Sequence, residues 1–499
     1  MKDKIIFWID ADLIDFCLAY YIQNSYNAEY YAIVDVTNKQ KKFFVKQQLV
    51  KFHKVWFVND HVKINNQNVD LSYLSSFEEK YRINLWTLAI NERLFYRFNK
   101  FHKFSTNQIL SILEQECKLF EKVILEIKPN FLISHESFFH RDEIFQQLCK
   151  VFNVKKLIYY HLKFIYKCMI SEEVNKPDFI ENLNLIKGTN RNFEDLQSYL
   201  KTKSVFAHHQ NYKNKKFGNY KLLRLKAAAK VLSSREDNTH YAYYGRTHIK
   251  LISHEIKYLV KRRIRKYFID KNFVKKINNN TPFVYYPLQM DEERNSLIGA
   301  PFYTNQTELL RHIAKSLPIG YKLYVKEHPS QALRDWRSIS EYKEIRDIPN
   351  VTLIHPQIPA EELYKKCSLV IAVGGASGFE AAIYQKPSII FSDFGYSMLP
   401  SVEEVKSIVD LPQIIRKSLQ KKLDPSDLDR YLIFLENNSF DFDLVGFFLK
   451  YQNSFYLGGN LLDNEISTSK MEIFLDNNKL ELEKFALEYI KKITQHHQL

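Results

Sequence analysis

Short apolar runs alternate with helix-like segments along two separate stretches of the chain, and this alternation restricts the fold more than any other feature. In the first stretch, strand-like runs occur at residues 4–9, 30–36, 55–58, 130–134 and 157–160. Helices with apolar residues near every third or fourth position are expected at 13–22, 41–52, 109–127 and 141–152. Strands that alternate with helices form βαβ units around a parallel sheet. The first third of the chain is therefore predicted to form an α/β lobe.

The alternation restarts after a long polar interval. Strand-like runs follow at 283–286, 321–325, 351–354, 369–373 and 388–391, with helices at 361–366, at 379–384 and after Asn305. We therefore predict an α/β fold of two Rossmann-like lobes with parallel sheets. The predicted parts are an N-terminal lobe (1–170), a basic helical connector (171–280), a second lobe (281–416) and a helical tail (417–499) with a closing C-terminal helix. This outline is typical of two-lobed nucleotide-sugar enzymes, which is an analogy of fold alone.

Composition narrows the class of protein further. Of the 499 residues, 45% are hydrophobic and 26% are charged, and these ordinary globular values exclude a mainly disordered chain. Lys and Arg total 72 and Asp and Glu total 57, which leaves a net charge of +15. A basic surface suits an anionic partner, such as nucleic acid, an anionic membrane or a phosphate-bearing small molecule. Charge alone does not choose among these partners.

Cysteine usage and apolar runs indicate the compartment. The five cysteines are widely spaced and form no C-x-x-C pair, which argues for a reducing compartment rather than a disulfide framework. The apolar run at 5–9 is interrupted by Asp10 and Asp12, too early for a signal peptide. No stretch of about 18 apolar residues occurs that could span a membrane. We therefore expect a cytoplasmic protein.

The most informative segment is 373–387, where a buried strand enters a turn of small residues and then a helix. Three glycines, Gly374, Gly375 and Gly378, allow the backbone to approach a ligand closely, and a helix N-terminus suits a phosphate. Ser377 and Glu380 have the spacing of a capping box, so the alternative is that Glu380 only caps its helix. The segment predicts a nucleotide-binding turn, with the capping alternative open.

Polar side chains follow two further strands of the second lobe. The strand at 321–325 runs directly into Lys326, Glu327 and His328, and Pro329 holds His328 in an extended conformation. Because ligands of open α/β sheets bind beyond the carboxyl ends of the strands, His328 and Lys326 are candidates to contact a phosphate. Gln289 and Glu293, which follow the strand at 283–286, either line the interlobe cleft or belong to a solvated acidic loop.

In the first lobe, the strand at 130–134 ends in His135 and Glu136. Either side chain is a candidate to accept a proton from an acceptor hydroxyl. Asp10 and Asp12 follow the first strand and compete for that role, although helix capping is the favoured interpretation of Asp12. No His or Cys spacing typical of zinc, no P-loop and no G-x-S-x-G occurs, so we expect neither a metal nor a cofactor.

The connector contains a strongly basic segment. Residues 257–276 carry nine Lys or Arg and one acid, Asp270, with aromatic and aliphatic residues interleaved. No nucleic-acid motif accompanies the segment, so we expect no nucleic-acid partner. The alternatives are a solvated helix and peripheral contact with an anionic membrane at its inner face.

With these motifs in hand, the second lobe resembles the bacterial capsular polysaccharide biosynthesis family. The resemblance rests on residues 283–289, Ala300 to Tyr303 with Gln306, residues 314–318 and 320–329, and the segment from Gly375 to Pro387. The match is dense from about 283 to 405, weak before 170 and absent from the connector. The family is similar to GT-B glycosyltransferases, including enzymes that transfer Kdo or sialic acid from CMP-activated donors.

The resemblance implies two lobes with the donor in the cleft, His328 facing the donor phosphate, and Ser377 and Glu380 at the nucleotide, with Glu380 a candidate for the ribose hydroxyls. Two departures concern the identity of the donor. Relatives usually carry His-x-x-Pro-Glu-Ala-Ser where this chain has Gln289 to Asn295, with Glu293 keeping the acidic position. The usual Gly-Thr-x-x-x-Glu is replaced by Ala376 to Glu380.

The expected function is a glycosyltransferase of surface polysaccharide synthesis that uses a nucleotide-activated sugar and a glycan or lipid-linked acceptor. Basic residues and helix N-termini are expected to stabilise the leaving phosphate without a metal. Three alternatives remain: a sugar-nucleotide 2-epimerase, a teichoic-acid-type polyol-phosphate transferase, and a non-catalytic partner in capsule assembly.

Overall fold

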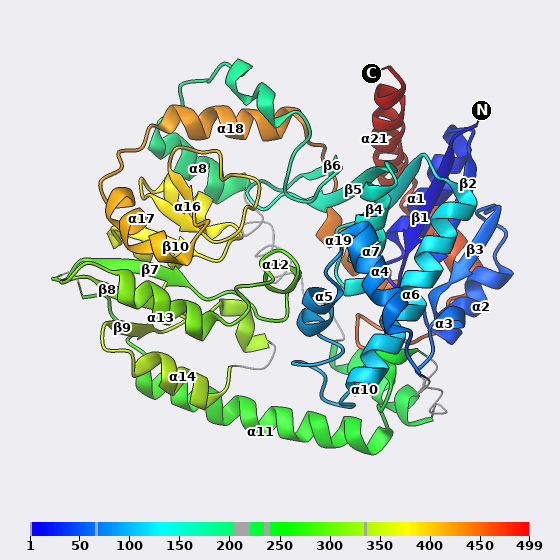
Figure 1. The fold of residues 1–499 in the computed structure, drawn as a ribbon, viewed down its shortest axis with the longest axis horizontal. Coiled ribbons are helices and arrows are strands. Elements are labelled where there is room, and N and C mark those ends of the chain that lie inside the picture. The colour runs from blue at the N-terminus through cyan, green and yellow to red at the C-terminus, as the bar shows by residue number, and fades with distance from the viewer. Residues whose placement is uncertain are drawn as a thin grey trace.

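The computed structural model describes residues 2–64, 68–203, 220–233, 240–278, 280–333 and 337–498. Two six-stranded sheets lie side by side, each flanked by helices on both faces (Figure 1). We call the unit around the sheet β3-β2-β1-β4-β5-β6 lobe 1, and the unit around β12-β11-β10-β7-β8-β9 lobe 2.

Lobe 1 has the strand order of a doubly wound Rossmann sheet. Its strands are β1 (Lys4–Ile9), β2 (Glu29–Val34), β3 (Lys54–Phe57), β4 (Phe131–His135), β5 (Lys155–His161) and β6 (Cys168–Ser171). They pair in parallel except for β6, which is antiparallel to β5. Its helices are α1 (Ile14–Ser25), α2 (Asn38–Lys46), α3 (Val58–His61), α4 (Leu71–Tyr81), α5 (Leu85–Asn91), α6 (Thr106–Ile127) and α7 (His140–Val151).

Lobe 2 repeats that order when its strands are numbered from its own first strand, and all of its strands are parallel. The strands are β7 (Phe283–Pro287), β8 (Lys322–Lys326), β9 (Val351–Ile354), β10 (Leu369–Ala372), β11 (Ser388–Ile390) and β12 (Val402–Glu404). The helices are α12 (Arg294–Leu297), α13 (Gln306–Ser316), α14 (Ile339–Arg346), α15 (Ala360–Lys366), α16 (Ser377–Ile383), α17 (Leu411–Ser418) and α18 (Pro425–Asn437). The predicted fold class of two Rossmann-like lobes is confirmed.

One predicted helix has the wrong bounds. The helix expected at 41–52 begins at Asn38, where Thr37 and Gln40 form a capping box, and it ends at Lys46. Gln47 leaves the helix in an extended conformation, and its side-chain oxygen accepts from the Val50 backbone N–H at 2.9 Å. Val50 is buried although it is not helical, because the loop itself packs on the core. Apolar spacing alone therefore extended the predicted helix too far.

The connector contains the helices α8 (Phe193–Lys203), α10 (Tyr220–Ser233) and α11 (His248–Asn272) and short 3-10 turns at Ile180–Leu185 and Tyr241–Tyr243. Two further 3-10 turns lie in lobe 2, at Pro329–Leu333 and Ile408–Asp410. Helix α8 packs against α16 and α18 of lobe 2. Helix α11 runs along one edge of the molecule beneath both lobes (Figure 1). Lys250 near its start donates to the Phe101 carbonyl of lobe 1 at 3.0 Å, and Ile269 and Phe273 near its end are buried in the core of lobe 2. The helix is therefore fixed at both ends.

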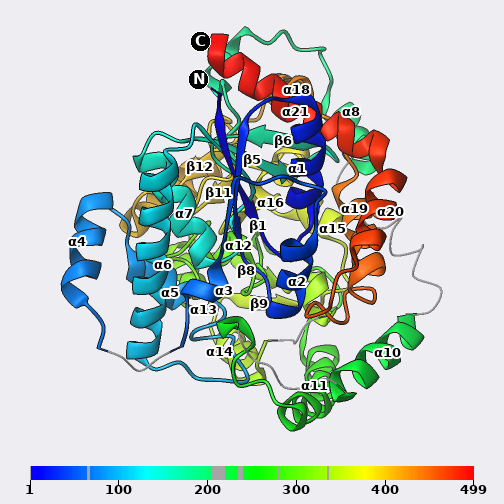
Figure 2. The ribbon, with the colours of Figure 1, turned by 90° about the vertical axis from the view of Figure 1, so that its right-hand side faces the viewer.

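The tail returns to lobe 1 through α19 (Leu444–Phe455), α20 (Thr468–Asn477) and α21 (Lys479–Gln498). Helix α21 packs against α1, as Figure 2 shows, and Phe447, Phe485 and Tyr489 are buried in the lobe 1 core. The closing C-terminal helix is thus present. The predicted domain limits stay predictions, although the two sheets lie within residues 4–171 and 283–404. None of the helices in the described part of the chain is long and apolar enough to cross a membrane.

A buried network of charges joins the part of the connector just before α11 to lobe 1. The two ring nitrogens of His140 lie 2.8 Å from the Glu92 and Glu116 carboxylates, and the Tyr241 hydroxyl donates to Glu116 at 2.8 Å. Burial by itself lowers the pKa of His140, but Glu116 and Glu92 outweigh burial and raise it to about 9. The protonation state of each group in this network therefore depends on the charges of the neighbouring groups.

This network predicts a loss of stability in mildly alkaline solution. The pKa of His140 is raised from 6.5 to about 9 on folding, so its contribution is fully present below pH 6.5 and is lost as the pH rises through 9. The loss amounts to about 3 kcal/mol. Urea unfolding of the wild type and of His140→Gln at several pH values measures it. We expect the stability difference between the two proteins to shrink from pH 6.5 to 9, and a constant difference would contradict the assignment.

Candidate functional site

Each sheet has a point at which its strand order reverses, between β1 and β4 in lobe 1 and between β7 and β10 in lobe 2. In doubly wound sheets, ligands bind outside the carboxyl ends of the strands at this switch point. Asp10 follows β1 and His135 ends β4, whereas Gln289 follows β7 and Gly374 follows β10. Residues chosen from the sequence as strand-end groups therefore gather at the two switch points.

At the lobe 2 switch point, Gln289 reaches across from β7 to the glycine turn after β10. Its side-chain nitrogen donates to the Gly374 carbonyl at 3.4 Å, and a Cβ on Gly375 would lie 3.4 Å from its side-chain oxygen. Gly375 has φ +79°, the left-handed conformation that glycine adopts readily. The loop after β7 and the glycine turn after β10 therefore meet at the switch point.

The other two glycines of the turn are required by packing. A Cβ on Gly374 would lie 1.8 Å from the Phe394 ring, and a Cβ on Gly378 would lie 2.7 Å from the Tyr396 hydroxyl. That hydroxyl also donates to the Gly375 carbonyl at 2.8 Å. The absence of side chains at 374 and 378 therefore accommodates aromatic residues of lobe 2, and direct contact of these glycines with a ligand stays a prediction.

Glu380 does not cap its helix, so the capping alternative is wrong. Helix α16 begins at Ser377 itself, its N-cap is Ala376, and no side chain caps it. The Glu380 carboxylate instead accepts from the Tyr364 hydroxyl of α15 at 2.8 Å. Burial raises the pKa of Glu380, and Tyr364 and Lys326 oppose this shift. Burial likewise lowers the pKa of Lys326 to about 8, with Glu380 opposing. A buried lysine and a partly buried carboxylate thus lie near each other beside the switch point.

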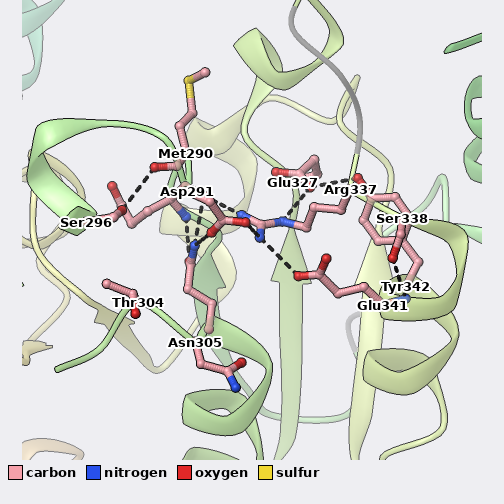
Figure 3. Close-up of polar contacts among 12 residues, drawn as sticks. Met290, Asp291, Ser296, Thr304, Asn305, Glu327, Arg337, Ser338, Glu341 and Tyr342 are labelled. Carbon is pink, nitrogen blue, oxygen red and sulfur yellow. Dashed lines mark hydrogen bonds and ion pairs between the residues drawn. The ribbon is translucent and has the colours of Figure 1, made fainter. Parts of the chain in front are cut away.

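The loop that carries His328 is held by a buried arginine. Glu327 is fully buried and accepts from the His328 backbone N–H at 2.7 Å, from the Tyr342 hydroxyl at 2.7 Å and from Arg337 Nε at 3.0 Å. Arg337 also binds the Asp291 carboxylate and the Gln289 carbonyl (Figure 3). One guanidinium therefore ties the loop after β8 to the loop after β7.

The hydrogen bonding of His328 fixes which of its nitrogens can donate. Its Nδ1 accepts from the Ser330 backbone N–H at 3.2 Å. In the neutral imidazole the proton must then reside on Nε2. The ring is only half-buried, whereas Lys326 beside it in the chain is buried. This arrangement suits donation from Nε2 to a phosphate oxygen.

Charged residues of both lobes meet at a seam that the sequence only partly revealed. Glu136 of lobe 1 lies 3.7 Å from Arg294 of α12, next to Glu293, which occupies the N-cap position of that helix. Lys163 Nζ donates to Asn295 at 3.1 Å and lies 4.0 Å from the centre of the Phe394 ring. Burial lowers the pKa of Lys163 to about 7, and Glu136 opposes the shift.

Lys163 was not predicted as a site residue, because polar residues were considered just after the other strands but not after β5. That strand ends at His161, two residues earlier, so the rule that selected His135 also selects Lys163. Tyr364 and Arg337 were missed for another reason. Both lie outside the strand ends, Tyr364 within α15 and Arg337 just before α14, and only the folded structure brings them to the site.

At the lobe 1 switch point, His135 is surrounded by carboxylates. It is 2% exposed, and its Nδ1 lies 2.8 Å from Asp15 and its Nε2 3.5 Å from Asp10. Burial alone lowers the pKa of His135, but Asp10 and Asp15 outweigh burial and raise it well above 6.5. Asp12 accepts from the Ile14 N–H at 3.3 Å, but it lies one residue before Leu13, which is the N-cap of α1, so Asp12 is not the N-cap residue that the favoured interpretation expected. Burial and Asp10 together raise the pKa of Asp12 to about 7.

The lobes touch beside these sites. Asn91 donates to the Pro301 carbonyl at 3.0 Å, and Arg97 donates to the Thr304 carbonyl at 3.2 Å and lies 3.5 Å from Asp291. The cavity between α5, α7 and α12 measures only about 10 Å³. Ligand sites commonly occupy about 300–1,000 Å³. A nucleotide sugar therefore does not fit in this part of the seam as the lobes stand.

The described residues contain no group of three or more His, Cys, Asp or Glu side chains that could hold a metal ion. The expectation that neither a metal nor a cofactor takes part stays a prediction.

Two Rossmann-like lobes of the same strand order, with the tail returning to the first lobe, define a GT-B-like α/β architecture. Residues 189–399 match the family model described as capsule polysaccharide biosynthesis protein, which confirms the resemblance inferred from the motifs. The match begins within the connector, so the expectation of no resemblance there was wrong.

Solved structures of two kinds resemble this chain. The UDP-GlcNAc 2-epimerase from Methanocaldococcus jannaschii is 12% identical, with 88% of this chain and 100% of that chain covered and a TM-score of 0.24. The KpsC β-Kdo 2,7 transferase of Thermosulfurimonas dismutans is 13% identical, with 70% and 87% covered and a TM-score of 0.29. The KpsC β-Kdo 2,4 transferase from the same organism is 11% identical, with 62% and 85% covered and a TM-score of 0.29. No curated protein matches the sequence.

Proposed function

We propose that this protein is a glycosyltransferase of surface polysaccharide synthesis, capsular or lipopolysaccharide, which moves a sugar from a nucleotide-activated donor to a glycan or lipid-linked acceptor. The family match over residues 189–399 supports a role in capsule polysaccharide biosynthesis. The observation that carries the proposal is the placement of buried Lys326 and partly buried Glu380 near each other at the lobe 2 switch point, beside the His328 loop. A cation, a carboxylate and an N–H donor together suit a ligand with both phosphate and hydroxyl groups.

The phosphate of the donor is assigned to His328 and Lys326. His328 offers the Nε2 proton, because its Nδ1 is already an acceptor. Lys326, with a pKa of about 8, is mostly charged at neutral pH, and a nearby phosphate favours that charged form further. As the sugar leaves, negative charge develops on the phosphate, and these donors stabilise it without an added metal.

The nucleoside is assigned to the glycine turn and Glu380. The Glu380 carboxylate accepts one hydrogen bond from Tyr364, which leaves acceptor capacity for the two hydroxyls of a ribose. Gln289, placed beside Gly375, offers an amide to the same ligand. Ser377, the first residue of α16, completes this side of the site.

The proton acceptor is assigned to lobe 1. His135 is a poor base, because the carboxylates around it keep it protonated at neutral pH. Asp12, with a pKa of about 7, has the value that suits a general base at neutral pH. Glu136 faces Arg294 across the seam and, with Glu293 and Lys163, is assigned to position the acceptor.

Glu380→Gln tests the nucleoside assignment. Losing charge-assisted hydrogen bonds to the ribose costs about 1.5–3 kcal/mol, so nucleotide affinity should fall by about ten- to hundredfold. Stability should change little, because the glutamine oxygen still accepts from Tyr364. Calorimetric titration with CMP, CDP, UDP, GDP and dTDP, beside a melting curve, measures both quantities.

Two variants make this test specific. Glu308→Gln makes the same chemical change on exposed α13 and should leave affinity unchanged. Tyr364→Phe removes the donor that orients Glu380 and should weaken binding to an intermediate extent. If Glu380→Gln binds every nucleotide as tightly as the wild type does, Glu380 is not at the nucleoside.

A further inference from the structure

Helix α11 presents an apolar stripe to solvent, away from both lobes. Seven of its large apolar side chains are between 49% and 81% exposed: Ile249, Ile252, Ile256, Leu259, Val260, Ile264 and Tyr267. Their spacing follows the helical period, so all seven lie within one arc of about 140° around the helix axis. We call this set the α11 stripe. Exposed apolar side chains are common singly, but a continuous stripe of them marks an interaction surface.

The opposite side of the helix faces the protein. Ile269 is 2% exposed and belongs to the core of lobe 2, with Phe268 packed beside it. Val260 of the α11 stripe precedes Ile269 by nine residues, which is half a turn out of phase at about 100° per residue. The stripe is therefore not the core-facing side of α11. This also corrects the sequence interpretation, because Phe268 and Phe273 of the basic segment serve the core rather than an external surface.

Cationic side chains border the stripe. Lys257 and Lys261 are exposed along one edge, Lys266 along the other, and Arg263 lies within the arc. Long cationic side chains can lay their aliphatic parts on an apolar surface while their charges reach an anionic one. An apolar stripe with basic edges is the pattern of a helix that lies in the plane of an anionic membrane surface.

The place of α11 in the fold suits a flat partner. In Figures 1 and 2 it lies at the outer edge of the molecule, beneath both lobes. One end is tied to lobe 1 by Lys250, and the other to lobe 2 by Ile269 and by the Asp270–His355 contact at 3.0 Å. Helix α11 is therefore held at both ends, and its apolar stripe faces solvent.

We propose that the α11 stripe docks this protein on an anionic lipid bilayer, with the stripe in the headgroup region and the bordering lysines and arginines on acidic headgroups. The charge argues against a second copy of the chain as the partner, because pairing two stripes would bring the two sets of like charges together. The proposal does not depend on the proposed transfer reaction, since none of these residues belongs to the assigned site.

Co-sedimentation of the full chain with vesicles tests the proposal. One vesicle type contains equal parts of phosphatidylglycerol and phosphatidylcholine, and the other contains phosphatidylcholine alone. At about 0.1 M salt we expect binding to the anionic vesicles at least about tenfold stronger than to the neutral ones. Raising the salt to about 1 M should abolish most of this difference, because the screening length falls from about 10 Å to about 3 Å.

Three sets of variants test whether vesicle binding depends on the α11 stripe and its basic edges or only on the positive net charge of the protein. Ile252→Gln with Ile256→Gln and Val260→Gln removes apolar surface, and Lys257→Glu with Lys261→Glu reverses one edge. Each set should reduce binding at least about tenfold without changing the melting temperature, because the side chains are exposed. Lys479→Glu with Lys491→Glu makes a matched charge change on α21, where both lysines are exposed, and should leave binding within about twofold.

Three results would overturn the proposal. They are no binding to anionic vesicles at low salt, equal binding to neutral vesicles, and full binding by both α11 variants. A lipid-free dimer in sedimentation velocity that the stripe variant dissociates would assign the stripe to a second copy instead.

Discussion

Replacing Arg337 with methionine should lower the free energy of unfolding by about 3–5 kcal/mol, because it leaves buried carboxylates without their cation. The Arg337 side chain is 1% exposed, and its guanidinium binds Glu327 at 3.0 Å together with Asp291. Glu327 is fully buried and Asp291 is nearly so, and the cation left to Asp291 would be Arg97, at the longer distance of 3.5 Å. Urea unfolding measures the loss as a lower midpoint at an unchanged slope.

Two further variants give this prediction a clear outcome. Arg346→Met makes the same change on the surface of α14, where the arginine side chain is 44% exposed, and should change stability by less than about 0.5 kcal/mol. Arg337→Lys keeps the charge but loses the fork of donors, so it should fall between the two. An unfolding midpoint for Arg337→Met equal to that of the wild type would show that the network does not stabilise the fold.

Replacing His328 with alanine should lower turnover by about ten- to hundredfold while the fold survives. One charge-assisted hydrogen bond to phosphate contributes about 1.5–3 kcal/mol, and the loss applies to the transition state, where the phosphate gains charge. The rate of nucleotide release at saturating donor measures the effect. His328→Gln should recover part of the rate, because its amide keeps an N–H donor.

The control for His328 is a second histidine of the same lobe. His312 lies on α13 with its side chain 41% exposed, so His312→Ala should keep the wild-type rate. Wild-type turnover in a folded His328→Ala protein would remove this residue from the site.

Strand bounds were predicted most accurately where a run of buried apolar residues marks the strand in the sequence. The strand at 351–354 was predicted with its observed bounds, and the first strand at 4–9 likewise, because runs of buried apolar residues are visible without the fold. Strands of other kinds were missed. Strand β12 (Val402–Glu404) contains two acids, and β6 is a four-residue antiparallel strand at the sheet edge. Neither carries a hydrophobic pattern long enough to identify.

The residues at which helices begin show a second limit of structure prediction from the sequence. A Ser or Thr followed three residues later by Glu or Gln has different outcomes at different helix starts. At Thr37 and Ser105 this pattern forms a capping box, whereas at Ser377 the helix begins one residue earlier and Glu380 turns to Tyr364. A shift of one residue thus takes Glu380 out of the capping position and leaves its carboxylate to contact Tyr364. Local sequence does not determine that shift, because the turn before α16 is set by packing of Gly374 on Phe394.

Only those features of the candidate site that follow from the positions of the strand ends could be predicted from the sequence. The carboxyl ends of parallel strands share an edge of the sheet, so the sequence could place Gln289, His328 and the glycine turn at one edge of lobe 2. The partners that tune them come from elsewhere in the chain: Tyr364 for Glu380, Arg337 for Glu327 and Asp15 for His135. Their contacts arise from tertiary packing, which has no signature in the spacing of residues.

The most direct test of the proposed function is to follow donor and acceptor in one reaction. The full chain is incubated with a set of nucleotide sugars, with and without a surface-polysaccharide fragment, and free nucleotide and acceptor mass are measured together, with His328→Ala as the control. The account predicts that one donor is consumed, that the acceptor gains the mass of one sugar, and that the control loses most of both. Conversion of the donor sugar without any acceptor would instead indicate an epimerase. Nucleotide release with transfer of a polyol phosphate would indicate the teichoic-acid-type reaction, and a protein that consumes no donor would contradict an enzymatic role.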